Sequence, residues 1–291
     1  MKIYGFMIVK NECDILAQTI ESLLTYGGFT KIFIFDNMSD DNTFAVAKKY
    51  ESDVVKASQL NTPFSDNLKF ENVYRHAALF NEGDWFAILD ADEIYAEALY
   101  PICERATKEG ANLIETKSAQ FYFTEKDDSY DFDSSEPAHM QRPFYLVNYG
   151  EPRVFKYAKS VTLSADYVKS RPNELIAAKH LFQIFHFQFR SSKQMQKRIQ
   201  VRIKNDKHSG NWGHVNATDW REYIVKSTYL HKYNGTIELG LPKQASLYKI
   251  PDNAAYTMAN ILWLKKHDFL SVEQRGFLKA SRLKRIFKRL F

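Results

Sequence analysis

Short apolar runs and segments with helical spacing alternate along the first 125 residues of the chain. Lys2–Lys10 and Trp85–Leu89 are almost wholly apolar inside, which predicts strands that are buried on both faces. Apolar residues recur every three or four positions over Ile15–Leu24, and Gly27 and Gly28 then end the predicted helix. Further strands are expected at Lys31–Phe35, Val54–Val55 and Asn112–Phe123, and further helices at Phe44–Tyr50, Asp66–Asn81 and Ala96–Glu109.

Strands that alternate with helices are typical of a parallel, doubly wound sheet, and such sheets bind ligands beyond the carboxyl ends of their strands. Two of the predicted strands end in a carboxylate there. Phe35 leads directly into Asp36, and Leu89 leads directly into Asp90. The sequence therefore predicts a ligand site at this edge of the sheet.

The second half of the chain has a different pattern. Glu125–Pro137 is polar and acidic, which predicts a surface loop or a lid. Aromatic-rich segments that predict strands follow at Phe144–Asn148, Arg153–Tyr157 and Leu181–Phe189, and a helical pattern begins after Arg190. No internal repeat interrupts this order.

The composition is that of a folded globular protein, with 15% aromatic and 26% charged residues. Cys13 and Cys103 are the two cysteines, and we expect free thiols in a reducing cytosol. No apolar run approaches the roughly 20 residues that span a bilayer. The first ten residues do not resemble a signal peptide, so we expect the chain to stay in the cytosol.

The formal net charge of +5 is unevenly distributed. Lys265–Phe291 carries nine Lys and Arg against two acids, which leaves the preceding 264 residues with a net charge of −2. Nucleic-acid binding requires a basic face on the folded domain itself, so this distribution argues against a nucleic-acid partner.

Asp90-Ala91-Asp92-Glu93 is the sharpest candidate for chemistry. In an extended chain, alternation places Asp90 and Asp92 on the same side, where their charges repel unless a cation or hydrogen-bond donors lie between them. Carboxylate oxygens suit Mg²⁺ or Mn²⁺, which also bind substrate phosphates. The alternative is an acidic turn that caps the next helix.

Three segments together carry a resemblance to a known family: Val9–Glu12, Asp36–Thr43 and Asp84–Glu93. Their order and spacing resemble the family-two-like nucleotide-sugar glycosyltransferases, in the bacterial branch with an N-terminal Lys-Asn-Glu motif and an Asp-x-Asp-Glu motif. The resemblance extends over residues 1–123, and His180–Arg202 is more loosely similar. It implies the GT-A fold: an α/β, Rossmann-like fold with a mostly parallel central sheet flanked by helices.

The resemblance also implies a domain organisation. Residues 1–230 are expected to form the GT-A domain, with a nucleotide-binding half over 1–123 and an acceptor-side half over 124–230. The resemblance carries nothing from about Tyr233 onward, and the residue pattern alone predicts that residues 231–291 form a helical C-terminal extension that ends in a basic amphipathic tail.

By the same resemblance, Asn11 and Glu12 belong to the nucleotide-sugar site. Asp36 is expected to recognise the base, Asp90 to lie near the ribose, and Asp92 to hold the Mn²⁺ or Mg²⁺ ion that bridges the diphosphate. A bound ion of this kind stabilises the charge that develops on the leaving group.

Three more residues have open roles. By the same resemblance His186 is a second candidate metal ligand, since a late histidine is a ligand in several enzymes of this fold, and alternation places it on a polar face with Gln188 and Arg190; the alternative is a packed histidine in an aromatic strand. Arg190 is expected either to bind the diphosphate or to form a surface salt bridge. Arg75, in the helix before the acidic strand, has the same two alternatives.

An inverting transferase needs a general base to deprotonate the acceptor hydroxyl. The Glu-Asp pair that usually serves the family is absent from the late part of this domain. Glu151, in Gly-Glu-Pro-Arg, is the first candidate base and Asp166 is the second. Each has the alternative of a turn or surface carboxylate.

The tail over 277–291 places apolar residues at helical spacing, with basic residues on the remaining faces. A basic amphipathic helix suits an anionic membrane surface, and the alternative is a helix that packs on its own domain or on a partner subunit. The apolar positions are Leu283, Ile286, Phe287 and Leu290.

The sequence therefore predicts a metal-dependent glycosyltransferase that moves a sugar from a UDP-linked donor to a glycan or glycolipid acceptor. Its expected setting is envelope polysaccharide or lipopolysaccharide synthesis on the inner face of a bacterial membrane. A sugar-phosphate nucleotidyltransferase is one alternative, although Lys10–Asp14 lacks the glycines of a phosphate loop. A non-catalytic, membrane-associated scaffold that retains the fold is another.

Overall fold

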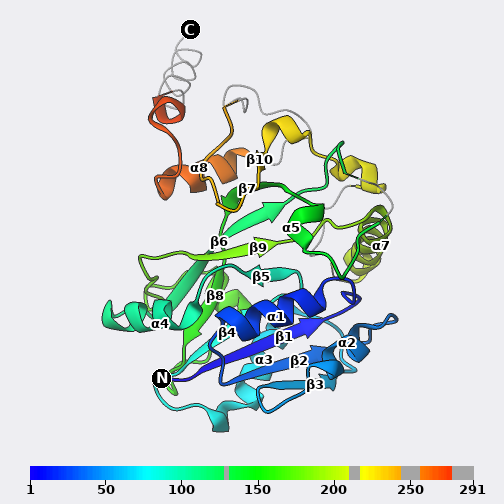
Figure 1. The fold of residues 1–291 in the computed structure, drawn as a ribbon. Helices are drawn as coiled ribbons and strands as arrows, with labels where there is room; N and C mark the ends of the chain where they lie inside the picture. Colours follow the sequence, from blue (N-terminus) through cyan, green and yellow to red (C-terminus); the bar gives the residue numbers. More distant parts are fainter. Residues whose placement is uncertain (128–130, 210–216, 244–255, 277–291) are drawn as a thin grey trace. The chain divides into compact units, whose positions relative to one another are not determined.

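The computed structural model describes residues 1–127, 131–209, 217–243 and 256–276 (Figure 1). The chain divides into two packed units. The first unit comprises Met1–Ser118 and Gly150–His186, and the second comprises Ala119–Tyr149 and Phe187–Phe291. This division does not follow the expected boundaries at 123 and 230, because the chain returns to the first unit at Gly150.

A sheet with β1 at its centre forms the body of the first unit. In the order β8-β4-β1-β2-β3, strands β1 to β4 are parallel and β8 is antiparallel to β4. The strands of this unit are β1 (Ile3–Val9), β2 (Lys31–Asp36), β3 (Val55–Gln59), β4 (Trp85–Leu89), β5 (Glu93–Tyr95), the start of β6 (Leu113–Phe121), β8 (Pro152–Lys156) and β9 (Phe182–His186). The expected α/β class with a mostly parallel central sheet is thus confirmed.

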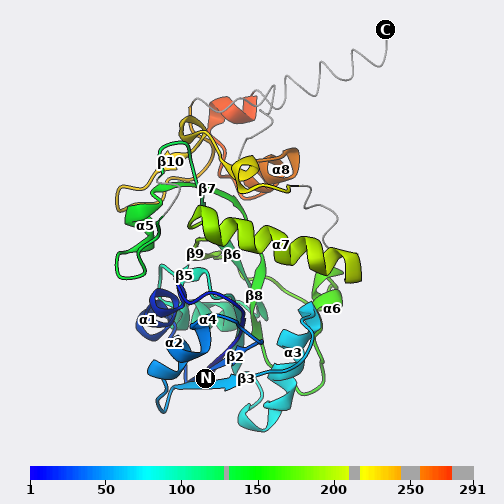
Figure 2. The same ribbon diagram turned by 90° about the vertical axis from the view of Figure 1, so that its right-hand side faces the viewer.

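Helices cover both faces of this sheet, with α1 and α2 on one face and α3 on the other (Figure 2). Strand β1 shows why both faces are apolar. Met7 and Val9 pack in the cluster under α1, whereas Phe6 and Ile8 pack on the α3 side. Burial on both faces is the reason for the continuous apolar runs in the sequence.

The helices of the first unit are α1 (Leu16–Tyr26), α2 (Thr43–Lys49), α3 (Asp66–Arg75), α4 (Leu99–Lys108) and α6 (Ala165–Lys169), with a 3₁₀ turn at Ala77–Leu79. The Ser65 side chain accepts a hydrogen bond from the Leu68 N–H and so caps α3. After α1, Gly28 has a φ of +62°, which a glycine adopts without strain. The predicted helix end at Gly27 and Gly28 is therefore confirmed.

Strands β5 and β9 pair antiparallel beside the main sheet, with Glu93 opposite His186. The start of β6 pairs antiparallel with β8, with an irregular register between Ile114 and Glu115. Strand β9 ends at His186, so the expected strand over Leu181–Phe189 is too long. Phe187 begins the next segment of the second unit, where its ring stacks on Phe121 at a centroid distance of 4.4 Å.

The second unit contains the end of β6 and an antiparallel pair of β7 with β10. Its other elements are β7 (Phe144–Tyr149), β10 (His231–Lys232), α5 (Ala138–Gln141), α7 (Ser192–Ser209), α8 (Met258–Lys266) and 3₁₀ turns at Trp220–Tyr223 and Ser227–Tyr229. Its core contains Leu146, Met195 and Ile261. The basic tail over 277–291 lies outside the described residues.

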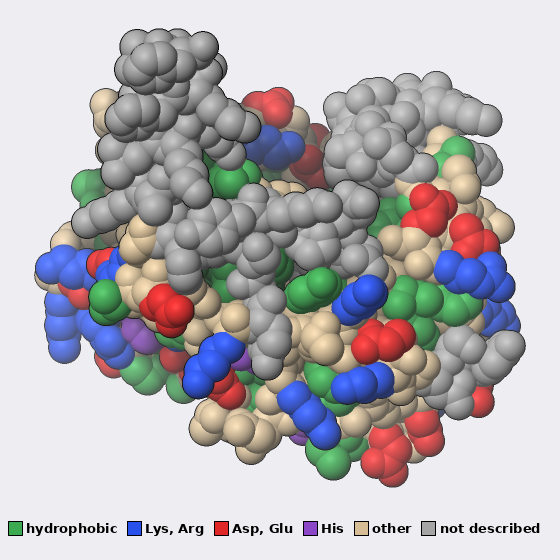
Figure 3. All heavy atoms as spheres, turned by 90° about the horizontal axis from the view of Figure 1, so that it is seen from above, with side chains coloured by type: hydrophobic (Ala, Val, Ile, Leu, Met, Phe, Trp, Pro, Cys, Tyr) green, Lys and Arg blue, Asp and Glu red, His purple; other side chains and the backbone are tan. Residues whose placement is uncertain are grey.

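Basic and acidic side chains of the described residues are interspersed on the face seen in Figure 3. Both cysteines are free thiols, as expected. Among the helices in the described part of the chain, none combines the length and the apolar character needed to cross a membrane.

Candidate active site

At the turn after β4, the side chains of Asp92 and His186, which are far apart in the sequence, lie close together in a buried position. Asp90 follows β4, residues 91 and 92 form a turn, and β5 begins at Glu93. Alternation in an extended chain therefore does not describe this segment, and Asp90 and Asp92 have different partners. The Asp92 Oδ1 atom lies 3.5 Å from the Nε2 atom of His186.

Pairing of β5 with β9 positions His186. Because His186 lies opposite Glu93 in the register, its ring reaches the residue just before that strand. The side chains of Asp92 and His186 are both buried, with residue exposures of 4% and 8%. The structure thus brings together the two residues that the sequence suggested as metal ligands.

Asp90 is bound by two cations instead. Lys69, on α3, forms an ion pair with its Oδ1 atom, and the Arg153 Nη2 atom lies 2.6 Å from its Oδ2 atom. Arg153 also lies 2.6 Å from Glu93 Oε1 and 3.0 Å from Glu151 Oε2. One guanidinium on β8 therefore joins carboxylates from three segments of the first unit.

This charge cluster shifts the pKa values of its members. Burial raises the pKa of the Asp90 carboxyl, but the Arg153 and Lys69 charges outweigh burial and hold that pKa below its ordinary value. Burial raises the pKa of Glu93 to about 7 although Arg153 opposes the shift. Burial lowers the pKa of Arg153, but Asp90 and Glu93 more than compensate and raise it well above its ordinary value.

The loops that follow β1 and β2 are joined by hydrogen bonds. The N–H of Asn11 donates to Ser39 Oγ at 3.0 Å, and the N–H of Glu12 donates to Thr43 Oγ1 at 2.9 Å. The Asn11 carboxamide accepts from the Asp40 N–H at 2.9 Å. Asn11 has a φ of +58°, a conformation that Asn tolerates better than most residues. These contacts hold both loops at the carboxyl edge of the sheet.

Asp36 and Asn37 lie at the end of β2 with exposures of 1% and 2%. The Asp36 Oδ2 atom accepts a long hydrogen bond, 3.4 Å, from the Ser39 N–H. Within the described residues, Asp36 Oδ1 and Asn37 Oδ1 are buried without a hydrogen-bond partner. A buried acceptor without a donor is costly, and a bound ligand is one way to satisfy it.

The other predicted site residues lie elsewhere. Arg75 is exposed at the end of α3 and pairs weakly with Glu71 at 3.7 Å. Asp166 is exposed in the first turn of α6. Arg190 is fully buried in the second unit, where its Nη1 donates to the Phe187 carbonyl at 2.8 Å, so the alternative of a surface salt bridge is wrong for it.

Sequence reasoning missed Lys69, Arg153 and Asn37. Lys69 lies in a predicted helix whose apolar face gave no reason to select it. Arg153 begins a predicted strand directly after Glu151 and Pro152, and an arginine in such a position is a usable signal for a buried ion pair. Asn37 directly follows the predicted strand, where an asparagine is typical of a turn.

Asp92 and His186 offer one carboxylate and one imidazole to an ion. Mg²⁺ prefers an all-oxygen shell, whereas Mn²⁺ accepts carboxylate and imidazole together, so this donor pair suits Mn²⁺ better. In the described ranges no group of three or more His, Cys, Asp or Glu residues is placed to hold a metal. A metal at this pair would therefore need phosphate or water oxygens to complete its shell.

The acidic turn lies in a region that is similar to a known family. Residues 6–148 match the family model described as Glycosyl transferase family 2. The comparison with curated proteins gave no match.

Solved structures give distant likenesses. The crystal structure of S. aureus TarS is 13% identical with a TM-score of 0.42, over 74% of this chain and 41% of that one, so this chain spans about two fifths of TarS. The structure of S. aureus TarS 1-349 in complex with UDP is 10% identical with a TM-score of 0.38, over 74% of this chain and 68% of that one. 4-Diphosphocytidyl-2C-methyl-D-erythritol synthase is 12% identical with a TM-score of 0.38, over 64% of this chain and 88% of that one.

The similarity to this family rests on residues 6–148, which include Asp36, Asp90 and Asp92.

Proposed function

We propose that this chain transfers a sugar from a nucleotide diphosphate-sugar donor, UDP-linked, to a glycan or glycolipid acceptor. One observation carries the proposal: within the matched region, Asp36 ends β2 and Asp90 follows β4, and these two strands flank β1. Two strand spacings separate these strands, about 10 Å, and the register places both carboxylates at the same edge. That separation suits a nucleoside with its base at one end and its ribose at the other.

Asp36 is proposed to bind the base. Its Oδ1 atom is a buried acceptor without a partner in the described part of the chain, and the imide N–H of uracil is a donor of matching type. Asp90 is proposed to lie beside the ribose, held in place by Lys69 and Arg153. Asn11 and Glu12 shape the neighbouring loop through Ser39 and Thr43.

Asp92 and His186 are proposed to hold Mn²⁺, with Mg²⁺ as the weaker choice. A bound divalent ion would offset the negative charge that develops on the diphosphate leaving group. Arg75 remains a proposed diphosphate contact on its residue type alone.

Glu151 is proposed to act as the general base of an inverting transfer. Its carboxylate is half exposed and 3.0 Å from Arg153, which orients it without burying it. The Glu151 carboxylate takes the proton of the acceptor hydroxyl while that oxygen bonds to the anomeric carbon. The bond from that carbon to the diphosphate oxygen breaks, and its electron pair leaves with the diphosphate. Asp166 is the second candidate base.

The acceptor and the setting are proposed from the sequence pattern. Envelope polysaccharide or lipopolysaccharide synthesis supplies lipid-linked acceptors at the inner face of the cell membrane. The basic amphipathic pattern over 277–291 suits attachment to that anionic surface.

The proposal is tested by calorimetric titration of UDP with and without Mn²⁺, followed by an assay of donor hydrolysis. We expect UDP binding that Mn²⁺ strengthens and that Asp92→Ala abolishes. Glu104→Ala is the matched control, because Glu104 is exposed on α4. Glu97 is less suitable as a control, since its carboxylate binds His180 and accepts the Gln183 N–H. Absence of Mn²⁺-dependent binding by any nucleoside diphosphate would overturn the proposal.

A further inference from the structure

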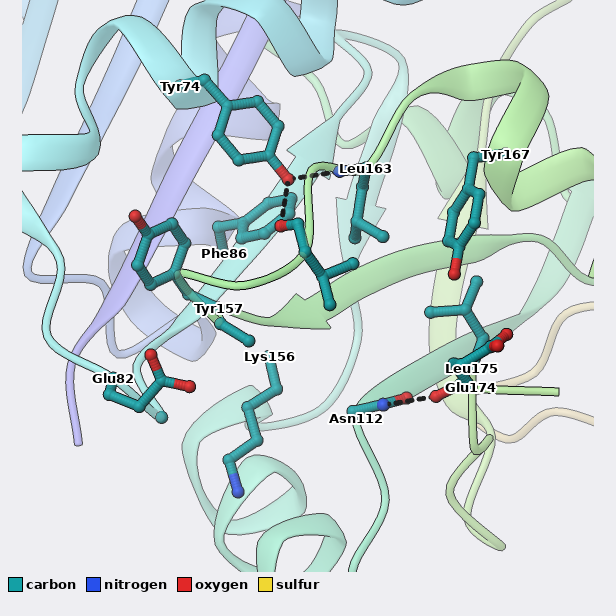
Figure 4. A pocket seen from close by; sticks show the side chains of 13 residues that line it. Tyr74, Glu82, Phe86, Asn112, Lys156, Tyr157, Leu163, Tyr167, Glu174 and Leu175 are labelled. Atoms are coloured by element: carbon teal, nitrogen blue, oxygen red, sulfur yellow. Dashed lines mark hydrogen bonds between the residues drawn. The ribbon is translucent and has the colours of Figure 1, made fainter. Parts of the chain in front are cut away.

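The first unit has a pocket of about 370 Å³ that the proposed donor site does not use (Figure 4). Phe86, near the start of β4, lines it, whereas Asp90 follows the end of the same strand. Four residue steps along a strand amount to about 13 Å. The pocket is thus a separate place near the opposite end of β4, and its volume lies in the range of small-molecule sites.

Aromatic and aliphatic side chains form the walls of the pocket. The rings come from Tyr74, Phe86, Tyr157 and Tyr167, and the aliphatic contacts from Val161, Leu163 and Leu175. Figure 4 shows the Tyr167 hydroxyl directed toward Leu175. Flat ring faces of this kind suit a ligand that itself presents an apolar face.

Charged groups of both signs also line the pocket: Lys156, Glu82 and Glu174. The Lys156 ammonium, the Glu174 carboxylate and the Tyr167 hydroxyl form no hydrogen bond or ion pair with other described residues. Glu82 retains one carboxylate oxygen after Oε2 accepts the Lys159 N–H at 3.0 Å. The pocket therefore offers donors and acceptors together, with nearly balanced charge.

Hydrogen bonds fix the segments that carry these groups. The Tyr74 hydroxyl accepts the Leu163 N–H at 2.5 Å and holds the loop before α6. Asn112 donates from Nδ2 to the Glu174 carbonyl at 2.7 Å and accepts the Ile176 N–H at 2.8 Å. Because these contacts are internal to the protein, the pocket is preorganised, and a ligand need not order it on binding.

The lining discriminates between ligand classes. A hydrocarbon chain would leave Lys156 and Glu174 without hydrogen-bond partners from the ligand. An anion such as phosphate would meet one ammonium and two carboxylates. A neutral ring with hydroxyl groups at its edge and an apolar face satisfies both the rings and the polar side chains.

We propose that this pocket binds a neutral saccharide unit of the acceptor glycan, at a subsite remote from the acidic turn. The choice of a glycan rests on the proposed function, whereas the chemistry of the pocket is independent of it. The subsite would hold a part of the acceptor that does not react.

The test is saturation-transfer NMR on the full chain with methyl glycosides of glucose, galactose, mannose and N-acetylglucosamine. We expect transfer to at least one glycoside. Tyr167→Phe and Lys156→Met should each weaken its affinity by about three- to tenfold, the effect of one lost hydrogen bond. Tyr26→Phe and Lys49→Met, at exposed positions of the same unit, are the matched controls and should bind as the wild type does.

Two results would overturn the proposal. One is no transfer to any of the four glycosides. The other is transfer that survives both pocket substitutions unchanged, which would place the saccharide elsewhere.

Asp92→Ala separates this proposal from the proposed function. That variant should lose Mn²⁺-dependent UDP binding and keep the glycoside signal. If UDP fails to bind the wild type while the glycoside signal stays sensitive to Tyr167→Phe, the transferase proposal fails and the saccharide pocket stands.

Discussion

The Nη2 atom of Arg153 lies 2.6 Å from the Oδ2 atom of Asp90, so a cation of the protein itself binds the first carboxylate of the acidic turn. The same guanidinium lies 2.6 Å from Glu93 Oε1. Both partners are largely buried, and a buried charge that loses its partner is strongly destabilising.

Arg153→Gln is therefore expected to lower the free energy of unfolding by about 3–5 kcal/mol, because it leaves Asp90 and Glu93 without this countercharge. The melting temperature should fall by about 10 °C. Arg105→Gln, at an exposed position of α4, should change it by less than about 2 °C. Equal melting temperatures of the two variants would show that the cluster does not stabilise the fold.

His186→Ala is expected to weaken Mn²⁺ binding in the presence of UDP by at least about tenfold, since it removes the imidazole beside Asp92. Electron paramagnetic resonance of free Mn²⁺ measures the affinity. His180→Ala is the control, because His180 pairs with Glu97 at 3.2 Å and not with Asp92. The same loss in both variants would argue against a ligand role for His186.

The two candidate bases are separated by their kinetics. Glu151→Gln should lower kcat by about 10²- to 10⁴-fold with little change in the donor KM, because proton removal is a transition-state effect. Asp166→Asn should leave both constants near the wild type, since Asp166 lies exposed in the first turn of α6. The reverse result would transfer the role of base to Asp166.

Cys13 should resist alkylation in the folded protein. Burial, followed by the hydrogen bond to the Asp41 carboxylate, raises the pKa of Cys13 to about 11. At pH 8 the folded protein therefore holds only about one thiolate in a thousand, and iodoacetamide reacts with the thiolate. Mass spectrometry should show faster labelling after urea unfolding.

Asp41→Asn should speed the labelling of folded Cys13, because it removes the negative charge that opposes ionisation. Asp53→Asn, at an exposed position elsewhere in the same unit, should leave the labelling rate of Cys13 unchanged.

Because the pKa of the Cys13 thiol is raised on folding, the folded state keeps this proton to a higher pH than the unfolded state does. The free energy of unfolding is therefore expected to fall as the pH rises from about 9 to about 11.

Membrane attachment is checked by co-sedimentation with vesicles that contain anionic phosphatidylglycerol. Replacing the tail residues Arg282, Lys284, Arg285, Lys288 and Arg289 by Gln should abolish binding at low salt. Vesicles of neutral phosphatidylcholine are the control for both chains. Unchanged sedimentation of the variant with anionic vesicles would remove the tail as an anchor.

The sheet could be predicted because β1 and β4 are buried on both faces, and strands buried in this way consist of continuous apolar runs. The carboxylates at the strand ends followed from the same pattern. The proximity of Asp92 and His186 was anticipated through a family resemblance, and the β5–β9 pairing now gives it a structural basis.

Lys69 and Arg153 could not be predicted by local pattern, since they lie 21 and 63 residues from Asp90. Which cation meets which carboxylate depends on how α3 and β8 pack, and spacing along the chain does not encode that. The turn at 91 and 92 escaped prediction for a related reason: pairing of β5 with β9 redirects the chain immediately after β4.

The pairing of β5 with β9 also determines how much of the chain must be synthesised before the Asp92–His186 pair can form. Asp92 is translated 94 residues before His186, and Arg153 also follows the family region at 6–148. A nascent chain that has reached only residue 148 holds the acidic turn without its guanidinium and its imidazole. Domains fold as units as they emerge from the ribosome, so the Asp92–His186 pair forms only after β9 has been made.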